Sequence, residues 1–298
     1  RALGTTAPTR QAEPDRTDRS IGVTAAAGPT PSGGPARVRP SAVAGMFYPG
    51  SPDSLGSAVR TAFADAVTPA ADAPVPKALV VPHAGYMYSG AIAASAYARI
   101  IPARSTIRRV VLLGPSHRVY VRGLAVPGVD AFETPLGIVP IDSDARDAVL
   151  ELPGVRVDDR AHADEHSLVV QLPFLQSVLD DFALLPFSVG DATVDEVMAV
   201  LDACWGGPET LVVISTDLSH YHRHDEATRL DARTAAAIVA CRPDDVGDSD
   251  ACGAYPLRGL LQAASERGLS VAQLDLRNSG DTAGDRHRVV GYGAFAVS

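Results

Sequence analysis

Short apolar runs alternate with segments of helical periodicity along most of the chain. Leu55, Val59 and Phe63 recur at helical spacing, and Ser51 and Pro52 precede them as a capping residue and a proline at the first helical position. This pattern predicts a helix. Runs of consecutive apolar residues predict strands that are buried on both faces. Such strands are predicted at residues 78–81, 110–113, 184–187 and 211–214.

Further elements complete an alternating order of strands and helices. Helices are predicted near residues 90–101, 165–180, 193–204, 225–240 and 256–267, and two closing strands near 271–276 and 289–297. Continuous apolar strands that alternate with helices are typical of an α/β fold. The sequence therefore predicts an α/β domain with a mainly parallel central sheet that helices cover on both faces.

The start of the chain differs from the rest in composition. Residues 1–37 contain no Phe, Trp or Tyr, and residues 28–35 consist of Gly, Pro, Ser and Thr alone. Such a segment cannot bury enough apolar surface to offset the entropy lost when it becomes ordered. We therefore expect a disordered tail at 1–37 and a single α/β domain at 38–298.

The overall composition narrows the class of protein. Of the 298 residues, 46% are hydrophobic and 20% are charged, which excludes wholesale disorder. The net charge is −9, so nucleic-acid binding is not expected. Lys77 is the only lysine, so it is the one residue that could form a Schiff base. No apolar run approaches the roughly 20 residues that a membrane span requires, so no membrane association is expected.

The cysteines indicate a reducing compartment. There are three of them, Cys204, Cys241 and Cys252, with no C-x-x-C spacing. This pattern fits neither a disulfide framework nor a structural zinc knuckle. The first residues also lack the apolar stretch of a signal peptide, so the sequence predicts a cytoplasmic location.

Three of the predicted strands are followed within a few residues by a histidine. These histidines are His83, His117 and His220, with Asp217 shortly before the last. In open parallel sheets, ligands bind at the carboxyl ends of the strands. A single histidine is more often structural, but three that converge on one edge indicate a metal or catalytic site.

Two further residues are candidates for the same site. Cys252 lies directly before a predicted helix, where the helix dipole favours a thiolate that could act as nucleophile or ligand; the alternative is a small packing residue. His166 lies at the predicted start of the helix at 165–180, a poor place for a protonated imidazole, which hints at another purpose. Helix capping is a sufficient explanation for the neighbouring Asp164 and Glu165.

The chain resembles the Memo family, whose bacterial members are called AmmeMemoRadiSam system protein B. The similarity extends from about Arg39 to the end of the chain and rests on six blocks in the family's order. They are Ala-Gly-Met-Phe-Tyr-Pro at 44–49, Pro-His-Ala-Gly-Tyr at 82–86, Leu-Gly-Pro-Ser-His at 113–117, Asp-Glu-His-Ser at 164–167, Ser-Thr-Asp-Leu-Ser-His-Tyr at 215–221 and Ala-Cys-Gly at 251–253.

The resemblance implies a fold and a set of site residues. The family's fold is similar to that of class III extradiol ring-cleaving dioxygenases, which are α/β enzymes that use non-haem iron. Its metal ligands correspond to His83, His117 and Cys252 of this chain. Asp217 and His220 are expected in the same pocket, with His220 as acid or base and Asp217 orienting its imidazole.

The metal is expected to be iron or copper. Two histidines and one cysteine would by ligand softness favour zinc or copper, whereas the resemblance favours redox-active iron or copper, so zinc stays as an alternative. His166, Tyr48 and Tyr86 are expected to be further residues of the pocket.

These observations predict a metal-dependent redox or dioxygenase-like enzyme that acts on an unknown small molecule or peptide. A non-catalytic module that binds a peptide or a protein is one alternative. A zinc-dependent hydrolase, with His220 and Asp217 activating water, is another. No G-x-S-x-G motif supports a serine nucleophile. The family's name also implies a functional link to radical S-adenosylmethionine and AMMECR-type proteins.

Overall fold

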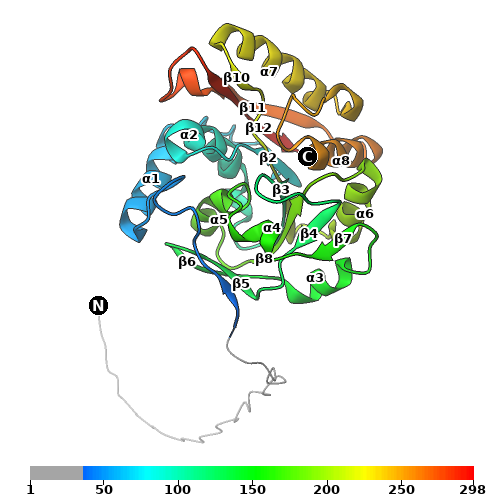
Figure 1. Cartoon of the computed structure of the whole chain (residues 1–298). Helices are drawn as coiled ribbons and strands as arrows, with labels where there is room; N and C mark the ends of the chain where they lie inside the picture. The colour runs from blue at the N-terminus through cyan, green and yellow to red at the C-terminus, as the bar shows by residue number, and fades with distance from the viewer. Residues whose placement is uncertain (1–35) are drawn as a thin grey trace, which may run out of the picture. The chain divides into compact units, whose positions relative to one another are not determined.

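Four parallel strands form the centre of a nine-stranded sheet in the computed structural model, which describes residues 36–298 (Figure 1). They lie side by side in the order β2 (Ala78–Val81), β9 (Thr210–Ser215), β3 (Arg109–Pro115) and β8 (Ala183–Val189). All four strands predicted from apolar runs are confirmed. The predicted tail at 1–37 lies outside the described residues except for its last two positions.

Antiparallel strands extend the sheet on both sides. On one side, β12 (Val289–Val297) pairs with β2, and β10 (His220–His222) and β11 (Val271–Asn278) pair with β12. On the other side, β4 (Leu124–Val126) runs antiparallel to β8 and parallel to β7 (Val155–Val157). The predicted parallel order therefore holds for the centre of the sheet, and antiparallel strands flank it.

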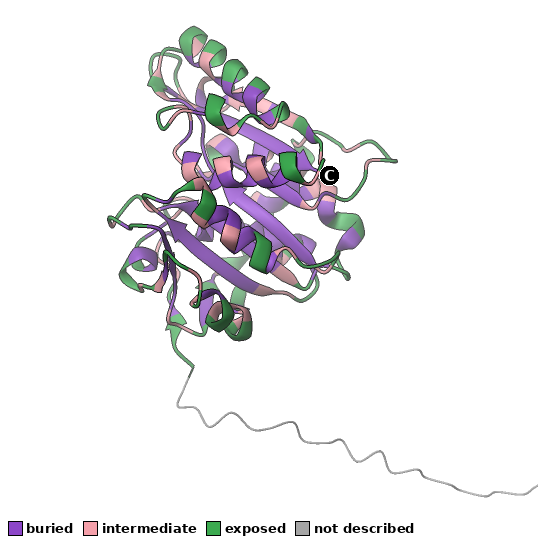
Figure 2. Cartoon of the chain, turned by 90° about the vertical axis from the view of Figure 1, so that its right-hand side faces the viewer, coloured by how far each residue is buried: buried purple, intermediate pink, exposed green. Residues whose placement is uncertain are grey.

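The central strands are buried because both of their faces carry apolar side chains. In β2, Leu79 and Val81 belong to one hydrophobic core, and Ala78 and Val80 belong to a second core on the opposite face. This alternation follows from the period of two in a strand. Figure 2 shows the strands buried between helices whose outer surfaces are exposed.

Helices cover both faces of the sheet, as predicted. The first core is packed against α1 (Pro52–Ala64), α2 (Tyr86–Tyr97), η1 (Ala98–Ala103) and α5 (Leu172–Val178). The second core is packed against α6 (Val194–Cys204), α7 (His224–Val239) and α8 (Ala254–Glu266). None of the helices in residues 36–298 is long and apolar enough to cross a membrane.

Shorter elements connect these layers. They include a three-stranded sheet of β1 (Val38–Arg39), β5 (Ala131–Thr134) and β6 (Gly137–Pro140), and the helices α3 (Ser143–Val149), α4 (Arg160–Ala163), η2 (Val169–Gln171), η3 (Pro243–Asp245) and η4 (Ser279–Asp281). The helix predicted at 165–180 is shorter than expected. Residues 164–168 form a loop, since the side chain of Glu165 accepts the backbone N–H groups of His166 and Ser167.

Candidate metal centre

Three histidines meet at the carboxyl edge of the central sheet. His83 follows β2, His117 follows β3, and His166 lies in the loop before η2. One ring nitrogen from each lies within 4.8 Å of the others, and together they form a group able to hold a metal ion. The ring centroids of His83 and His117 are 5.3 Å apart, and those of His117 and His166 are 4.7 Å apart.

The ring of His83 is held so that its Nε2 is free of a proton. The hydroxyl of Ser215, at the end of β9, donates to the carbonyl oxygen of Ser167 at 2.6 Å and accepts from the amide of Gln171 at 2.9 Å. It therefore also accepts from Nδ1 of His83, at 2.9 Å. Because Nδ1 carries the proton, the lone pair of Nε2 is available to a metal.

Glu165 holds His117 in the same tautomer. Its carboxylate, 1% exposed, accepts from Nδ1 of His117 at 2.9 Å and from the backbone N–H of the same residue at 2.5 Å. Burial alone would raise the pKa of Glu165, but these hydrogen bonds and the neighbouring imidazole lower it to about 2. Glu165 is therefore ionised, and Nε2 of His117 is left free to bind a metal.

His166 completes the group from a position of intermediate burial, between those of buried His83 and exposed His117. Its ring stacks between Phe47, at a centroid distance of 4.3 Å, and His117. Within residues 36–298 its buried Nδ1 makes no hydrogen bond, although Glu165 lies 3.3 Å away. Burial lowers the pKa of His166 to about 4, so the ring is neutral at physiological pH and able to act as a ligand.

Cys252 lies beside His83 but not within the three-histidine group. Its Sγ is 3.3 Å from Nε2 of His83, and the backbone N–H of Asp217 donates to it at 3.3 Å. Burial, with the carboxylate of Asp217, raises the pKa of the thiol to about 12. The expectation that the dipole of α8 favours the thiolate is therefore wrong, because burial of the sulfur outweighs the dipole.

Asp217 and His220 lie at the same sheet edge, but the predicted contact between them is wrong. The carboxylate of Asp217 accepts the backbone N–H of His83 at 2.8 Å, and burial raises its pKa to about 7. The imidazole of His220 instead donates from Nδ1 to the carbonyl oxygen of Leu218 at 2.7 Å. The backbone, rather than Asp217, therefore fixes the tautomer of His220.

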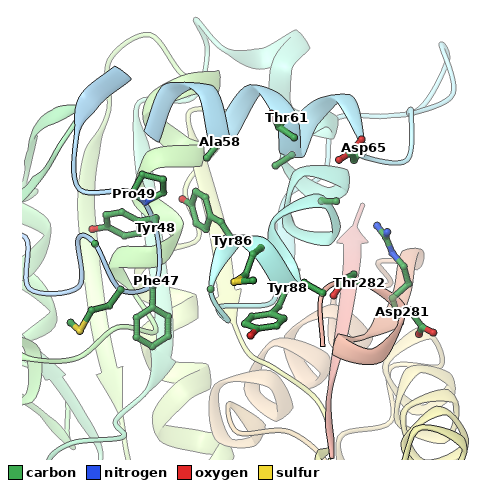
Figure 3. A pocket seen from close by; sticks show the side chains of 18 residues that line it. Phe47, Tyr48, Pro49, Ala58, Thr61, Asp65, Tyr86, Tyr88, Asp281 and Thr282 are labelled. Carbon is green, nitrogen blue, oxygen red and sulfur yellow. The ribbon is translucent and has the colours of Figure 1, made fainter. Parts of the chain in front are cut away.

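The two predicted pocket tyrosines lie in a neighbouring groove. Tyr48 and Tyr86 line this groove together with Phe47 (Figure 3). The hydroxyl of Tyr86 donates to the carbonyl oxygen of Val170 at 2.8 Å, and that of Tyr48 lies 3.3 Å from the hydroxyl of Ser41. The ring of Phe47, a residue of the family block at 44–49 that was not predicted to line the pocket, connects the groove to the histidine group.

Glu165, Ser215 and Gln171 are the site residues that sequence reasoning missed. Helix capping was a sufficient explanation for Glu165, and the available signals were its place directly before His166 and its place in the family block at 164–167. Ser215 begins the family block at 215–221 but was given no role, and Gln171 carried no signal, because each acts through a contact with a residue that is distant in the sequence.

Comparisons with known proteins agree over almost the whole described chain. A family model described as Memo-like protein matches residues 39–296. The MEMO1 family protein of Methanopyrus kandleri is 36% identical over 286 residues, which cover 86% of this chain and 98% of the relative. That of Aquifex aeolicus is 36% identical over 268 residues, which cover 86% of this chain and 97% of the relative.

Several solved structures also match the chain, one of them over most of its own length. It is that of the uncharacterized protein JW3007 from Escherichia coli K12, with a TM-score of 0.49 and 15% sequence identity. The match covers 72% of this chain and 98% of that protein.

Proposed function

The chain belongs to the Memo family, and from this premise we propose that it is a metal-dependent redox enzyme of the dioxygenase-like type, with His83 and His117 as metal ligands. The observation that carries the proposal is that both imidazole rings are held in the same tautomer. Each has its Nδ1 proton given to a buried acceptor, Ser215 or Glu165, so that Nε2 is free. This is the usual arrangement of histidines that bind metals.

Cys252 is the third ligand in this proposal. Its Sγ lies 3.3 Å from Nε2 of His83, a separation expected of two donors that share one ion. The raised pKa of the free thiol means that binding must release its proton. A bound iron or copper ion would supply the redox chemistry at this site.

The residues around the ligands would handle protons and orientation. His220 has its proton on Nδ1, bonded to the carbonyl of Leu218, and burial lowers its pKa. Its Nε2 is therefore the atom that would accept a proton from a substrate. Asp217 would hold the backbone of His83 in place and add a carboxyl group of raised pKa to the pocket.

A zinc-dependent hydrolase is a second candidate, and the three-histidine group favours it. Three histidines within 4.8 Å of one another match the ligand set of some catalytic zinc sites, with His166 in place of Cys252. Such a site activates water rather than oxygen.

Metal content in matched variants separates these possibilities. The chain would be purified without oxygen, loaded with Fe(II), Cu(I) or Zn(II), desalted and analysed for metal. We expect one ion per chain in the wild type and in His222→Ala, and loss of the ion in His83→Ala. Loss in Cys252→Ser supports the redox proposal, whereas loss in His166→Ala with retention in Cys252→Ser supports the hydrolase.

Oxygen uptake on a panel of catechols then tests the reaction. We expect uptake by the loaded wild type and its loss in His220→Ala with the metal retained. Loaded protein that consumes no oxygen across the panel and hydrolyses no ester or amide contradicts an enzymatic role and favours a binding module. The cytoplasmic location and the link to radical S-adenosylmethionine and AMMECR-type proteins stay predictions.

A further inference from the structure

A groove of about 770 Å³ adjoins the histidine group. It lies between α1, α2 and the residues around η4 (Figure 3). Its volume is within the range of small-molecule binding sites in proteins. Phe47 lines the groove and stacks on His166, so a molecule bound at this end would lie next to the proposed metal centre.

One end of the groove is aromatic and apolar. The rings of Tyr48 and Tyr86 lie together with a centroid distance of 5.7 Å, next to Phe47. Met46 and Met87 also line the groove and are 71% and 67% exposed. Aromatic faces and flexible thioethers are suited to holding an apolar or aromatic body, and aromatic faces also attract cations.

The other end of the groove is acidic. Three charged residues line it: Asp65, Asp281 and Arg277. Arg277 is already paired, because its guanidinium donates to both carboxylate oxygens of Asp275, at 3.0 and 2.5 Å. Figure 3 shows Asp65 and Asp281 away from Phe47 and Tyr48. The groove therefore offers no free cation to an anionic ligand.

Asp65 carries the one lining carboxylate whose charge is not neutralised. Within residues 36–298 it forms no ion pair, whereas Asp281 accepts from His224 at 2.6 Å. Asp65 is also the C-cap of α1, a helix with no basic residue in its last turn. The negative end of the helix dipole and the carboxylate of Asp65 both contribute negative potential, so this end of the groove attracts a cation.

We propose that the groove binds an organic cation with an aromatic or apolar body, an arylalkylammonium compound in chemical class. The ammonium group lies at Asp65 and the aromatic body lies against Phe47, Tyr48 and Tyr86. That such a compound is the substrate rests on the proposed function, because Phe47 places its aromatic end beside His166. Its binding to the groove does not depend on the metal.

The test uses the full chain after treatment with a chelator, so that its outcome is separate from that of metal binding. The chain has only three methionines, and two of them line the groove. Methyl-13C labelling therefore places reporters at Met46 and Met87, with the buried Met198 on α6 as an internal control. The probes are benzylammonium, 2-phenylethylammonium and 4-phenylbutylammonium, with 4-phenylbutan-1-ol and 4-phenylbutyrate as neutral and anionic matches.

We expect the ammonium compounds to shift the methyl signals of Met46 and Met87 and to leave that of Met198 unchanged. 4-Phenylbutylammonium should bind about five- to tenfold more tightly than the alcohol, which is the scale of an exposed ion pair assisted by a helix terminus. Asp65→Asn should abolish this preference. Asp72→Asn removes an exposed acid of the following loop that does not line the groove, and should leave the preference intact.

Three results would overturn the proposal. One is the absence of a shift at Met46 and Met87 at millimolar concentrations of all three ammonium compounds. Another is equal or tighter binding of the alcohol or the carboxylate. The last is an equal loss of preference in Asp65→Asn and Asp72→Asn, which would reveal a general effect of net charge rather than a cation site.

Discussion

The rings of His83 and His117 owe their orientation to buried acceptors from other parts of the chain. The two histidines were predictable, because each follows an apolar run by a few residues. Their partners were not, since the hydrogen bonds of Ser215 and Glu165 to the rings exist only once distant segments pack together. Strand ends can be located by local pattern, whereas the groups that fix a tautomer depend on tertiary contacts.

Removing the charge of Glu165 should weaken the metal site without removing a ligand. In Glu165→Gln, the partner of Nδ1 of His117 is neutral and the ring is less basic, so metal affinity should fall about 10- to 100-fold. Competition with a chromophoric chelator measures this change. Asp164→Asn, at the exposed neighbouring position, should change the affinity little; an equal effect of both variants would show that only the overall charge matters.

Buried His162 should make the stability of the fold depend on pH. Burial lowers its pKa to about 4, below the value near 6.5 of the unfolded chain, while its Nε2 donates to the carbonyl of Ala125 at 2.9 Å. The contribution of neutral, buried His162 to the free energy of unfolding is therefore complete above about pH 6.5. It is lost as the pH falls towards 4. The wild type should lose more unfolding free energy than His162→Gln, by about 0.7 kcal/mol between pH 7 and 6 and by about 1.2 kcal/mol between pH 6 and 5.

Urea unfolding at pH 7, 6 and 5 measures this difference. Parallel pH dependence of the two proteins would mean that His162 does not hold a lowered pKa in the folded state. The comparison within one pair of proteins removes the contributions of the other buried histidines.

At the scale of elements, long periodic segments were predicted well and short ones were missed. The helix with Ser51 and Pro52 at its start is α1, and the two closing strands are β11 and β12. The strands and the helix between residues 124 and 157 were missed, because each is only three to seven residues long. Such segments carry too few positions for a period to be recognised.

The prediction that α1 begins at a capping serine can be checked directly at its N-cap. The side chain of Ser51 accepts the backbone N–H of Ser54 at 3.3 Å, so Ser51→Ala should cost about 1 kcal/mol of unfolding free energy. Ser57→Ala, an exposed position within the same helix, should cost nothing or stabilise slightly. Chemical denaturation of both variants provides the test, and an equal effect at the two positions would contradict the capping role.

At the scale of the whole molecule, the site follows from the direction of the central strands. β2, β9 and β3 are parallel, so His83, Asp217 and His117 arrive at one edge although up to 134 positions separate them. This convergence could be predicted from the order of strands and helices. His166 was predicted as a pocket residue, but its membership of the three-histidine group was not, because the loop that carries it comes from another part of the chain.

Metal binding should stabilise the entire fold, since its ligands come from distant segments that unfolding separates. At a free metal concentration 100 times the dissociation constant, the unfolding free energy should rise by about 2.7 kcal/mol. Thermal or chemical unfolding at increasing metal concentration measures this gain. His83→Ala should show no gain, while His222→Ala, with its histidine outside the cluster, should behave like the wild type.

Anomalous diffraction from crystals of the metal-loaded protein, collected at the absorption edge of the metal, tests the central claim most directly. The account predicts one peak about 2.0–2.3 Å from Nε2 of both His83 and His117, with Cys252 as the next donor. A peak that is absent from this position, or that lies at other residues, would contradict a metal centre at the edge of the sheet.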